Sequence, residues 1–120
     1  MIKDIMIYID DILTSIELIE EYIKDVSFNQ FEKDIGIQDK VLRRLEIIGE
    51  AARRLPKDFI KKYKEIPWRQ MIGLRNIIVH EYSVVNLREI WKIVFEELLE
   101  TKRLIRKIKK EVRSLKIKNF

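Results

Sequence analysis

The residues best suited to chemistry lie in one stretch, residues 71–82, which reads MIGLRNIIVHEY. The stretch holds His80, the only histidine in the chain, and Arg75, whose neighbours three and four positions away on both sides are apolar. An arginine in such surroundings needs a counter-charge or a function, because a buried charge without a partner is unfavourable. A histidine can give or take a proton near neutral pH, and a guanidinium can bind a phosphate through two hydrogen bonds. We therefore interpret this stretch as a candidate site.

The spacing of these residues constrains how they can meet. On an ideal helix, at about 100° per residue, Arg75 points roughly 140° away from His80, whereas Asn76 shares a polar face with His80. The arginine and the histidine can converge only if the helix breaks near His80, or if a second copy of the chain supplies one of them. Two valines and then Asn86, a good cap for a new helix, favour a break. We therefore place the candidate residues, including Tyr82, at a helix end and its exit turn.

Apolar residues recur every three or four positions along most of the chain, which is the pattern of amphipathic helices. The sequence predicts four main helices: over about residues 2–25, from 39 to the proline at 56, from the proline at 67 through the 71–82 stretch, and from 86 to 116. Shorter helical segments are predicted between Ser27, which can cap a turn, and Gly36, which ends it, and over residues 57–64.

Small side chains at Gly49, Ala51 and Ala52 make the second main helix thin, so that a neighbouring helix can approach it closely. We predict an all-α, up-and-down bundle of four main helices plus short helical turns, in a single domain over residues 1–120.

Composition agrees with a helical globular protein, since 47% of the 120 residues are apolar, 38% are charged, and only three are glycine and two proline. The chain has no cysteine, which excludes disulfides and thiolate metal sites, and its single histidine argues against structural zinc. We expect no metal and no cofactor.

The opening residues, MIKDIMIYIDD, carry acids throughout an apolar run, so we expect neither a signal peptide nor a membrane span. We therefore expect a cytoplasmic protein.

Charge is unevenly distributed along the chain, whose net charge is +5. Residues 1–25 carry seven acids and two lysines, whereas residues 102–118 carry nine basic residues and one acid. This predicts an acidic surface at one end and an anion-attracting surface at the other. We expect the basic end of the last helix, about residues 102–120, to project or to frame a cleft, although a solvated helix face explains its charge equally well.

Three blocks of sequence resemble a known family: IGEAARRLP at residues 48–56, IPWR at 66–69 and IGLRNIIVHEY at 72–82. In this order they resemble the HepT-like branch of the HEPN domains, over nearly the whole chain. The most specific element is Arg75, four residues, His80, one residue, Tyr82. The resemblance implies an all-α, HEPN-like fold.

The resemblance also implies a function: a metal-independent endoribonuclease that cleaves tRNA or mRNA and is the toxin of a type VII-like HepT/MNT toxin–antitoxin pair. Arg75 and His80 would be catalytic, in a cleft between the two subunits of a homodimer. Asn76 matches the polar residue that commonly follows the arginine. The partner would be a minimal nucleotidyltransferase (MNT) antitoxin, which in some members silences the toxin by transferring AMP to the motif tyrosine, here Tyr82.

Elementary chemistry is compatible with this function. Metal-free RNA cleavage uses the 2′-hydroxyl as nucleophile and needs one group to take its proton, one to protonate the leaving oxygen, and positive charge near the phosphorane. One chain offers a single histidine, whereas a two-fold dimer offers two His80 and two Arg75 side chains around one cleft. The histidine count therefore favours a homodimeric site.

Each candidate residue also has a purely structural interpretation. Arg75 can form an ion pair with Glu46 or Glu50 on the second main helix, and because such a carboxylate would also orient the guanidinium, Glu50 is a candidate supporting residue. His80 can be a helix cap or a surface residue. Tyr82 can be a packed core residue.

Two other functions fit the sequence. The chain can be a non-catalytic interaction module that binds a minimal nucleotidyltransferase and is AMPylated on Tyr82. It can also be a helical bundle that binds RNA through its basic last helix without cutting it, with strongly salt-dependent affinity.

Overall fold

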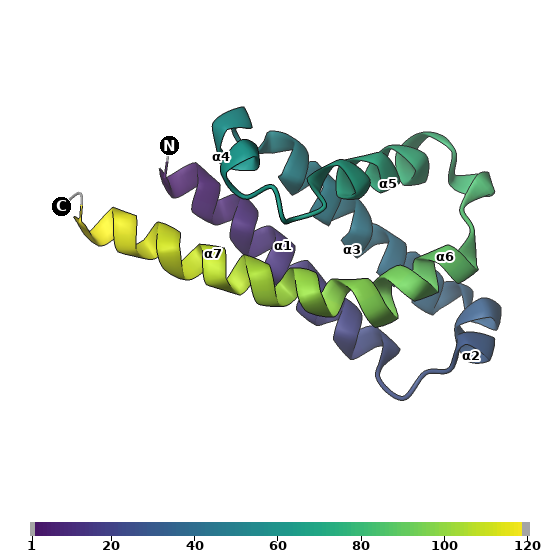
Figure 1. Cartoon of the computed structure of the whole chain (residues 1–120). Coiled ribbons are helices and arrows are strands. Elements are labelled where there is room, and N and C mark those ends of the chain that lie inside the picture. The colour runs from purple at the N-terminus through teal and green to yellow at the C-terminus, as the bar shows by residue number, and fades with distance from the viewer. Residues whose placement is uncertain (1, 119–120) are drawn as a thin grey trace.

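The chain is helical throughout the part described by the structure, a computed structural model that covers residues 2–118 and the side chains of residues 4–115. No strand occurs in this range. The α-helices are α1 (Ile2–Ile23), α2 (Phe28–Lys33), α3 (Ile35–Arg54), α4 (Lys57–Lys62), α5 (Trp68–His80), α6 (Leu87–Lys92) and α7 (Leu98–Lys118). A 3-10 turn, η1 (Tyr82–Val84), follows α5, and a π-helical turn, η2 (Ile93–Glu97), joins α6 to α7. The long helices lie alongside one another (Figure 1), so the predicted all-α bundle is confirmed.

The boundary between α2 and α3 differs from the sequence prediction. Gly36 was predicted to end the short turn, with the next helix starting near Asp39, but α3 already begins at Ile35 and includes the glycine. Asp34 is the reason, because its Oδ1 atom accepts a hydrogen bond from the backbone N–H of Ile37 at 3.0 Å and so caps the helix.

The two predicted helix caps are confirmed. The side chain of Ser27 accepts a hydrogen bond from the backbone N–H of Gln30, and the side chain of Gln30 accepts one from the backbone N–H of Ser27, which is a capping box. Asn86 caps α6 by accepting hydrogen bonds from the backbone N–H groups of Arg88 and Glu89. These caps define where α2 and α6 begin.

The last main helix runs as one element from Leu87 to Lys118, but it is not regular α-helix throughout. The π turn at residues 93–97 interrupts it, where the sequence predicted a continuous helix. A π turn inserts an extra residue and rotates the helix that follows. Phe95 in this turn and Leu99 just after it are both 57% exposed.

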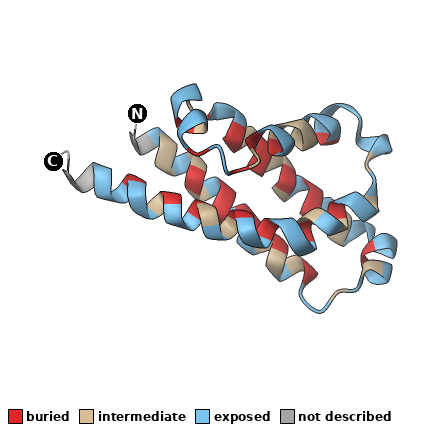
Figure 2. Ribbon diagram, viewed as in Figure 1, coloured by how far each residue is buried: buried red, intermediate tan, exposed pale blue. Residues whose placement is uncertain are grey.

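The core lies between α1, α3, α5 and the last helix, where the buried residues of each face the others (Figure 2). The isoleucines of the predicted α1 stripe supply its centre: Ile9, Ile12, Ile16 and Ile19 are fully buried. Within residues 2–118 no helix combines the length and the apolar character of a membrane span.

Ion pairs between α1 and α7 neutralise part of the acidic charge of the first helix and part of the basic charge of the last one. Lys102 lies 2.8 Å from Glu20, and Lys109 lies 2.6 Å from Asp10. The basic helix also buries apolar side chains as far as Val112. Up to that residue it therefore packs against the bundle rather than projecting, and residues 119–120 lie outside the described part of the chain.

Helix α5 lies closely against α3, and the thin part of α3 makes this possible. A Cβ atom placed on Gly49 would lie 2.2 Å from the Cβ of Arg75 and 2.6 Å from the carbonyl oxygen of Met71. These two atoms belong to the α5 backbone or are bonded directly to it, so they cannot move aside as the end of a flexible side chain would. The contact fixes the position of Arg75 relative to α3.

Replacing Gly49 with alanine should therefore destabilise the protein by about 1–3 kcal/mol, through overpacking between α3 and α5. Gly73 is the matched control, because a Cβ atom there would meet no atom within 4 Å. Gly73→Ala should stabilise the fold by roughly 0.5–1 kcal/mol, the ordinary gain from removing a glycine inside a helix. Denaturant unfolding of both variants measures this, and a Gly49→Ala protein as stable as wild type would contradict the close approach.

Candidate active site

Arg75 lies on the side of α5 that faces α3. Its side chain is 21% exposed, and its Nε atom lies 3.2 Å from Oε2 of Glu50. This contact is an ion pair rather than an aligned hydrogen bond, because the buried Nε finds no hydrogen-bond acceptor within the described residues. The Nη1 atom of the guanidinium donates a hydrogen bond to Oδ1 of Asn76 at 2.9 Å. Glu50 and Asn76 thus orient the guanidinium from two sides.

Glu50 is shared by three arginines. Its Oε1 atom accepts hydrogen bonds from Arg53 at 2.8 Å and Arg54 at 2.9 Å, while Oε2 faces Arg75 and also accepts a hydrogen bond from Nε of Arg53 at 3.3 Å. The hydrogen bonds from Arg53 and Arg54, together with the positive charges of Arg53 and Arg75, lower the pKa of Glu50 to about 2. The carboxylate is therefore ionised at any ordinary pH. Of the two acids that the sequence offered to Arg75, Glu50 forms the ion pair, and Glu46 pairs within α3 instead.

His80 is the last residue of α5 and is exposed. Its side chain makes no hydrogen bond or ion pair with the other described residues. The helix remains regular through His80, and its end is marked by Glu81, whose backbone N–H donates to the carbonyl oxygen of Ile77 at 2.8 Å. The predicted break thus falls after His80, and no contact joins its imidazole to Arg75 within one copy of the chain. The imidazole is available to solvent.

Tyr82 opens the 3-10 turn that leaves α5, and the residue is 53% exposed. The interpretation of Tyr82 as a packed core residue is therefore wrong. Its hydroxyl group donates a hydrogen bond to Oδ1 of Asp39, on α3, at 2.7 Å. This hydrogen bond, partial burial and the negative charge of Asp39 raise the pKa of the Tyr82 phenol, so the hydroxyl keeps its proton at neutral pH.

Sequence reasoning missed Asp39, which lies 43 residues from Tyr82 along the chain. No local pattern marks it, because one acid among many on a charged helix face carries no signal of a distant partner. Asn76 lies where the helical geometry predicted, exposed on α5 like His80. Within residues 2–118 no three His, Cys, Asp or Glu side chains gather as a set of metal ligands would.

With this geometry in place, comparison with known proteins identifies the family. A family model described as "Ribonuclease HepT-like" matches residues 12–108, most of the chain. The chain belongs to the HepT-like ribonuclease family.

Relatives of this HepT-like chain bear ribonuclease names. "Probable ribonuclease HepT" of Thermococcus cleftensis is 42% identical over 86% of this chain and 94% of that protein. "Putative RNase MJ1380" of Methanocaldococcus jannaschii is 41% identical over 92% of this chain and 94% of that protein. A third relative from the same organism, "Gamma-glutamylcyclotransferase and putative RNase MJ0434", is 44% identical over 93% of this chain, which spans only 50% of that protein. No solved structure gives a significant match.

Family membership and these names together support a ribonuclease. In this HepT-like chain one copy brings Arg75, Asn76 and Glu50 into contact, and separately brings Tyr82 to Asp39. It leaves His80 on the surface at the end of the same helix. The candidate residues therefore form two contact groups at α5 and its exit turn rather than one closed cluster.

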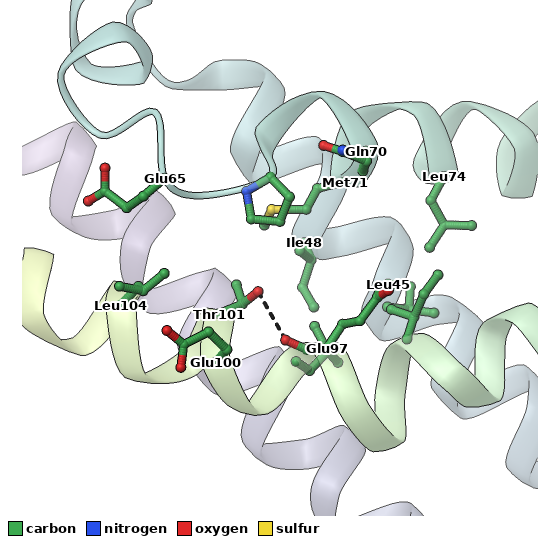
Figure 3. A pocket seen from close by; sticks show the side chains of 13 residues that line it. Leu45, Ile48, Glu65, Gln70, Met71, Leu74, Glu97, Glu100, Thr101 and Leu104 are labelled. Carbon is green, nitrogen blue, oxygen red and sulfur yellow. Dashed lines mark hydrogen bonds between the residues drawn. The ribbon is translucent and has the colours of Figure 1, made fainter.

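Two hollows lie near the site. One, of about 340 Å³, opens beside Arg75 and is lined by equal numbers of arginines and acids: Arg43, Arg54 and Arg75 against Asp11, Glu46 and Glu50. The other, of about 400 Å³, lies between α3, α5 and the last helix and is mainly apolar (Figure 3). In it, Thr101, the one polar interruption of the last helical stripe, donates a hydrogen bond to the carbonyl oxygen of Glu97 at 3.3 Å. Neither His80 nor Tyr82 lines either hollow.

Proposed function

We propose that this HepT-like chain is a metal-independent endoribonuclease that cuts tRNA or mRNA at a cleft between two copies of the chain. In the same proposal it is the toxin of a type VII-like pair whose antitoxin is a minimal nucleotidyltransferase. The observation that carries the proposal is the placement of His80, the chain's single histidine, exposed at the end of α5. Family membership supports the ribonuclease part of it.

The proposal of two copies is supported by the different placements of the two motif side chains within one copy. Arg75 is held toward α3 by Glu50, while the imidazole of His80 lies at the surface. The reaction needs both a base and an acid, and one copy has one imidazole. Two copies related by a two-fold axis would bring both His80 side chains and both Arg75 side chains to one cleft. Ile77 and Val79, each 40% exposed beside the motif, offer apolar surface for such a contact.

In the proposed reaction one neutral His80 takes the proton of the 2′-hydroxyl as its oxygen attacks the adjacent phosphorus. The bond from phosphorus to the 5′ oxygen breaks, and the protonated His80 of the second copy gives that oxygen a proton. Arg75 stabilises the negative charge that develops on the phosphorane. Glu50 and Asn76 hold the guanidinium in orientation at its Nε and Nη1 atoms. The products are a 2′,3′-cyclic phosphate and a 5′-hydroxyl.

The experiment is RNA cleavage by the protein expressed alone, in excess EDTA, after intact mass has shown that Tyr82 carries no adduct. Cleavage of total tRNA or mRNA that leaves 2′,3′-cyclic phosphate ends is the expected result. Cleavage that disappears in EDTA and returns with added Mg²⁺, or fragments with 3′-hydroxyl ends, would contradict the metal-free mechanism.

A second candidate function is favoured by the exposure of Tyr82. The residue is 53% exposed, which leaves it accessible to an enzyme. In this alternative the chain is a non-catalytic module that binds the minimal nucleotidyltransferase and receives AMP on Tyr82. The same modification also belongs to the toxin proposal, where it silences the nuclease.

A further inference from the structure

The exit turn after α5 is attached to the rest of the molecule by few contacts over residues 81–84, and Val85, which follows them, packs against the core. Glu81, Tyr82, Ser83 and Val84 are all exposed, and Val84 reaches 64%. The backbone hydrogen bonds of residues 81–85 stay within the turn or return to the end of α5. Among the described residues, Tyr82 to Asp39 is the one side-chain hydrogen bond that residues 81–85 make. This bond is therefore the polar link between the exit turn and α3.

Asp39 is well placed to hold the turn. It lies inside α3, which is fixed in the bundle by buried residues that begin two positions later at Val41, whereas Tyr82 lies two residues after His80. The phenol is long, and its hydroxyl meets Oδ1 of Asp39 at 2.7 Å, a short distance typical of a hydrogen bond to a charged acceptor. A rigid helix thus restrains a sparsely packed turn that directly follows the motif histidine.

We infer that Asp39 is a positioning residue: its hydrogen bond to Tyr82 is a latch that holds the exit turn, and with it His80, in the orientation that RNA cleavage needs. The inference rests on the proposed ribonuclease function. In this inference Asp39 acts through Tyr82, whose hydroxyl it holds. Small displacements of a catalytic group lower the rate strongly, because the reacting atoms must be aligned.

The latch also gives a route by which the proposed modification of Tyr82 would affect His80. When the phenol oxygen attacks the α-phosphorus of ATP, the new O–P bond forms, pyrophosphate leaves, and the phenol proton passes to a base. The hydroxyl then no longer has a proton to donate to Asp39. The product places a negatively charged phosphodiester beside the carboxylate, and the two like charges repel. Modification at this oxygen therefore opens the latch.

The test is a double-mutant cycle on full-length protein, with Asp39→Ala, Tyr82→Phe and the two combined. Each single variant should lower kcat for RNA cleavage by about tenfold or more with little change in KM, and the double variant should be no worse than either. Asp39→Asn keeps an oxygen that accepts the phenol hydrogen bond and should retain most of the activity. Glu17→Ala is the control for the loss of a negative charge, because Glu17 is an exposed acid on α1, far from the motif in sequence. This variant should cleave RNA like wild type.

Amide hydrogen exchange of Val84 and Val85, whose N–H groups donate the two hydrogen bonds that close the turn, gives a readout that does not depend on cleavage. Exchange should quicken in Asp39→Ala and Tyr82→Phe and stay near wild type in Asp39→Asn. If wild type fails to cut RNA, the ribonuclease proposal fails, while the exchange data still decide whether the latch exists. Unchanged exchange in Asp39→Ala would overturn the latch. Quickened exchange with unchanged kcat would overturn the positioning role.

Discussion

Replacing His80 with alanine should lower RNA cleavage by on the order of 10²–10⁴-fold, the usual contribution of a general acid or base. In a two-copy site the substitution removes both imidazoles, so neither the 2′-hydroxyl nor the leaving oxygen has a proton-transfer partner. The fold should be unaffected, because the side chain is exposed and makes no polar contact with the other described residues. The measurement compares initial rates of cleavage with unfolding curves of the same preparations.

Glu81→Ala is the matched control for this substitution. Glu81 is the exposed neighbour of His80, and only its backbone contributes to the end of α5. This variant should cleave RNA at close to the wild-type rate. A His80→Ala protein that is folded and cleaves RNA as fast as wild type would remove His80 from the mechanism.

If the proposed nucleotidyltransferase partner transfers AMP to this chain, replacing Tyr82 with phenylalanine should abolish the transfer, because the accepting oxygen is gone. The hydroxyl of Tyr82 is exposed at the turn, whereas Tyr63 is buried, with its hydroxyl bonded to Glu111. Incorporation of labelled AMP from ATP, followed by intact mass, measures the effect.

Tyr22→Phe serves as the control, since Tyr22 is half-buried on α1 and far from the motif in sequence. It should accept AMP as wild type does. Undiminished labelling of Tyr82→Phe would show that another residue is the acceptor and would leave Tyr82 only its contact with Asp39.

Periodic and local patterns made much of the fold predictable. The spacing of the isoleucines in α1 gave both the helix and its buried face, as the complete burial of Ile9 and Ile16 shows. The small residues around Gly49 predicted a close helix neighbour, and α5 is that neighbour. The apolar surroundings of Arg75 predicted a counter-charge, and Glu50 provides one. In each case the sequence pattern that allowed the prediction lies within a few turns of a single helix.

The features that the sequence did not predict depend on competing local signals or on contacts between residues far apart in the chain. Gly36 signals a helix end, but the side-chain cap from Asp34 fixed the start of α3 before it. The π turn at residues 93–97 has the composition of ordinary helix, so no local pattern marks it. The bond between Tyr82 and Asp39 joins two residues that only the assembled bundle brings together.

The most direct test of a site shared by two copies is the activity of a mixed dimer. Wild-type and His80→Ala chains carrying different tags are co-expressed, the mixed dimer is isolated through both tags, and its rate of RNA cleavage is measured in excess EDTA. If one His80 acts as the base and the other as the acid, the mixed dimer should cleave at less than about a tenth of the wild-type rate. A mixed dimer with half of the wild-type activity would mean that each copy works alone, and would contradict the shared site.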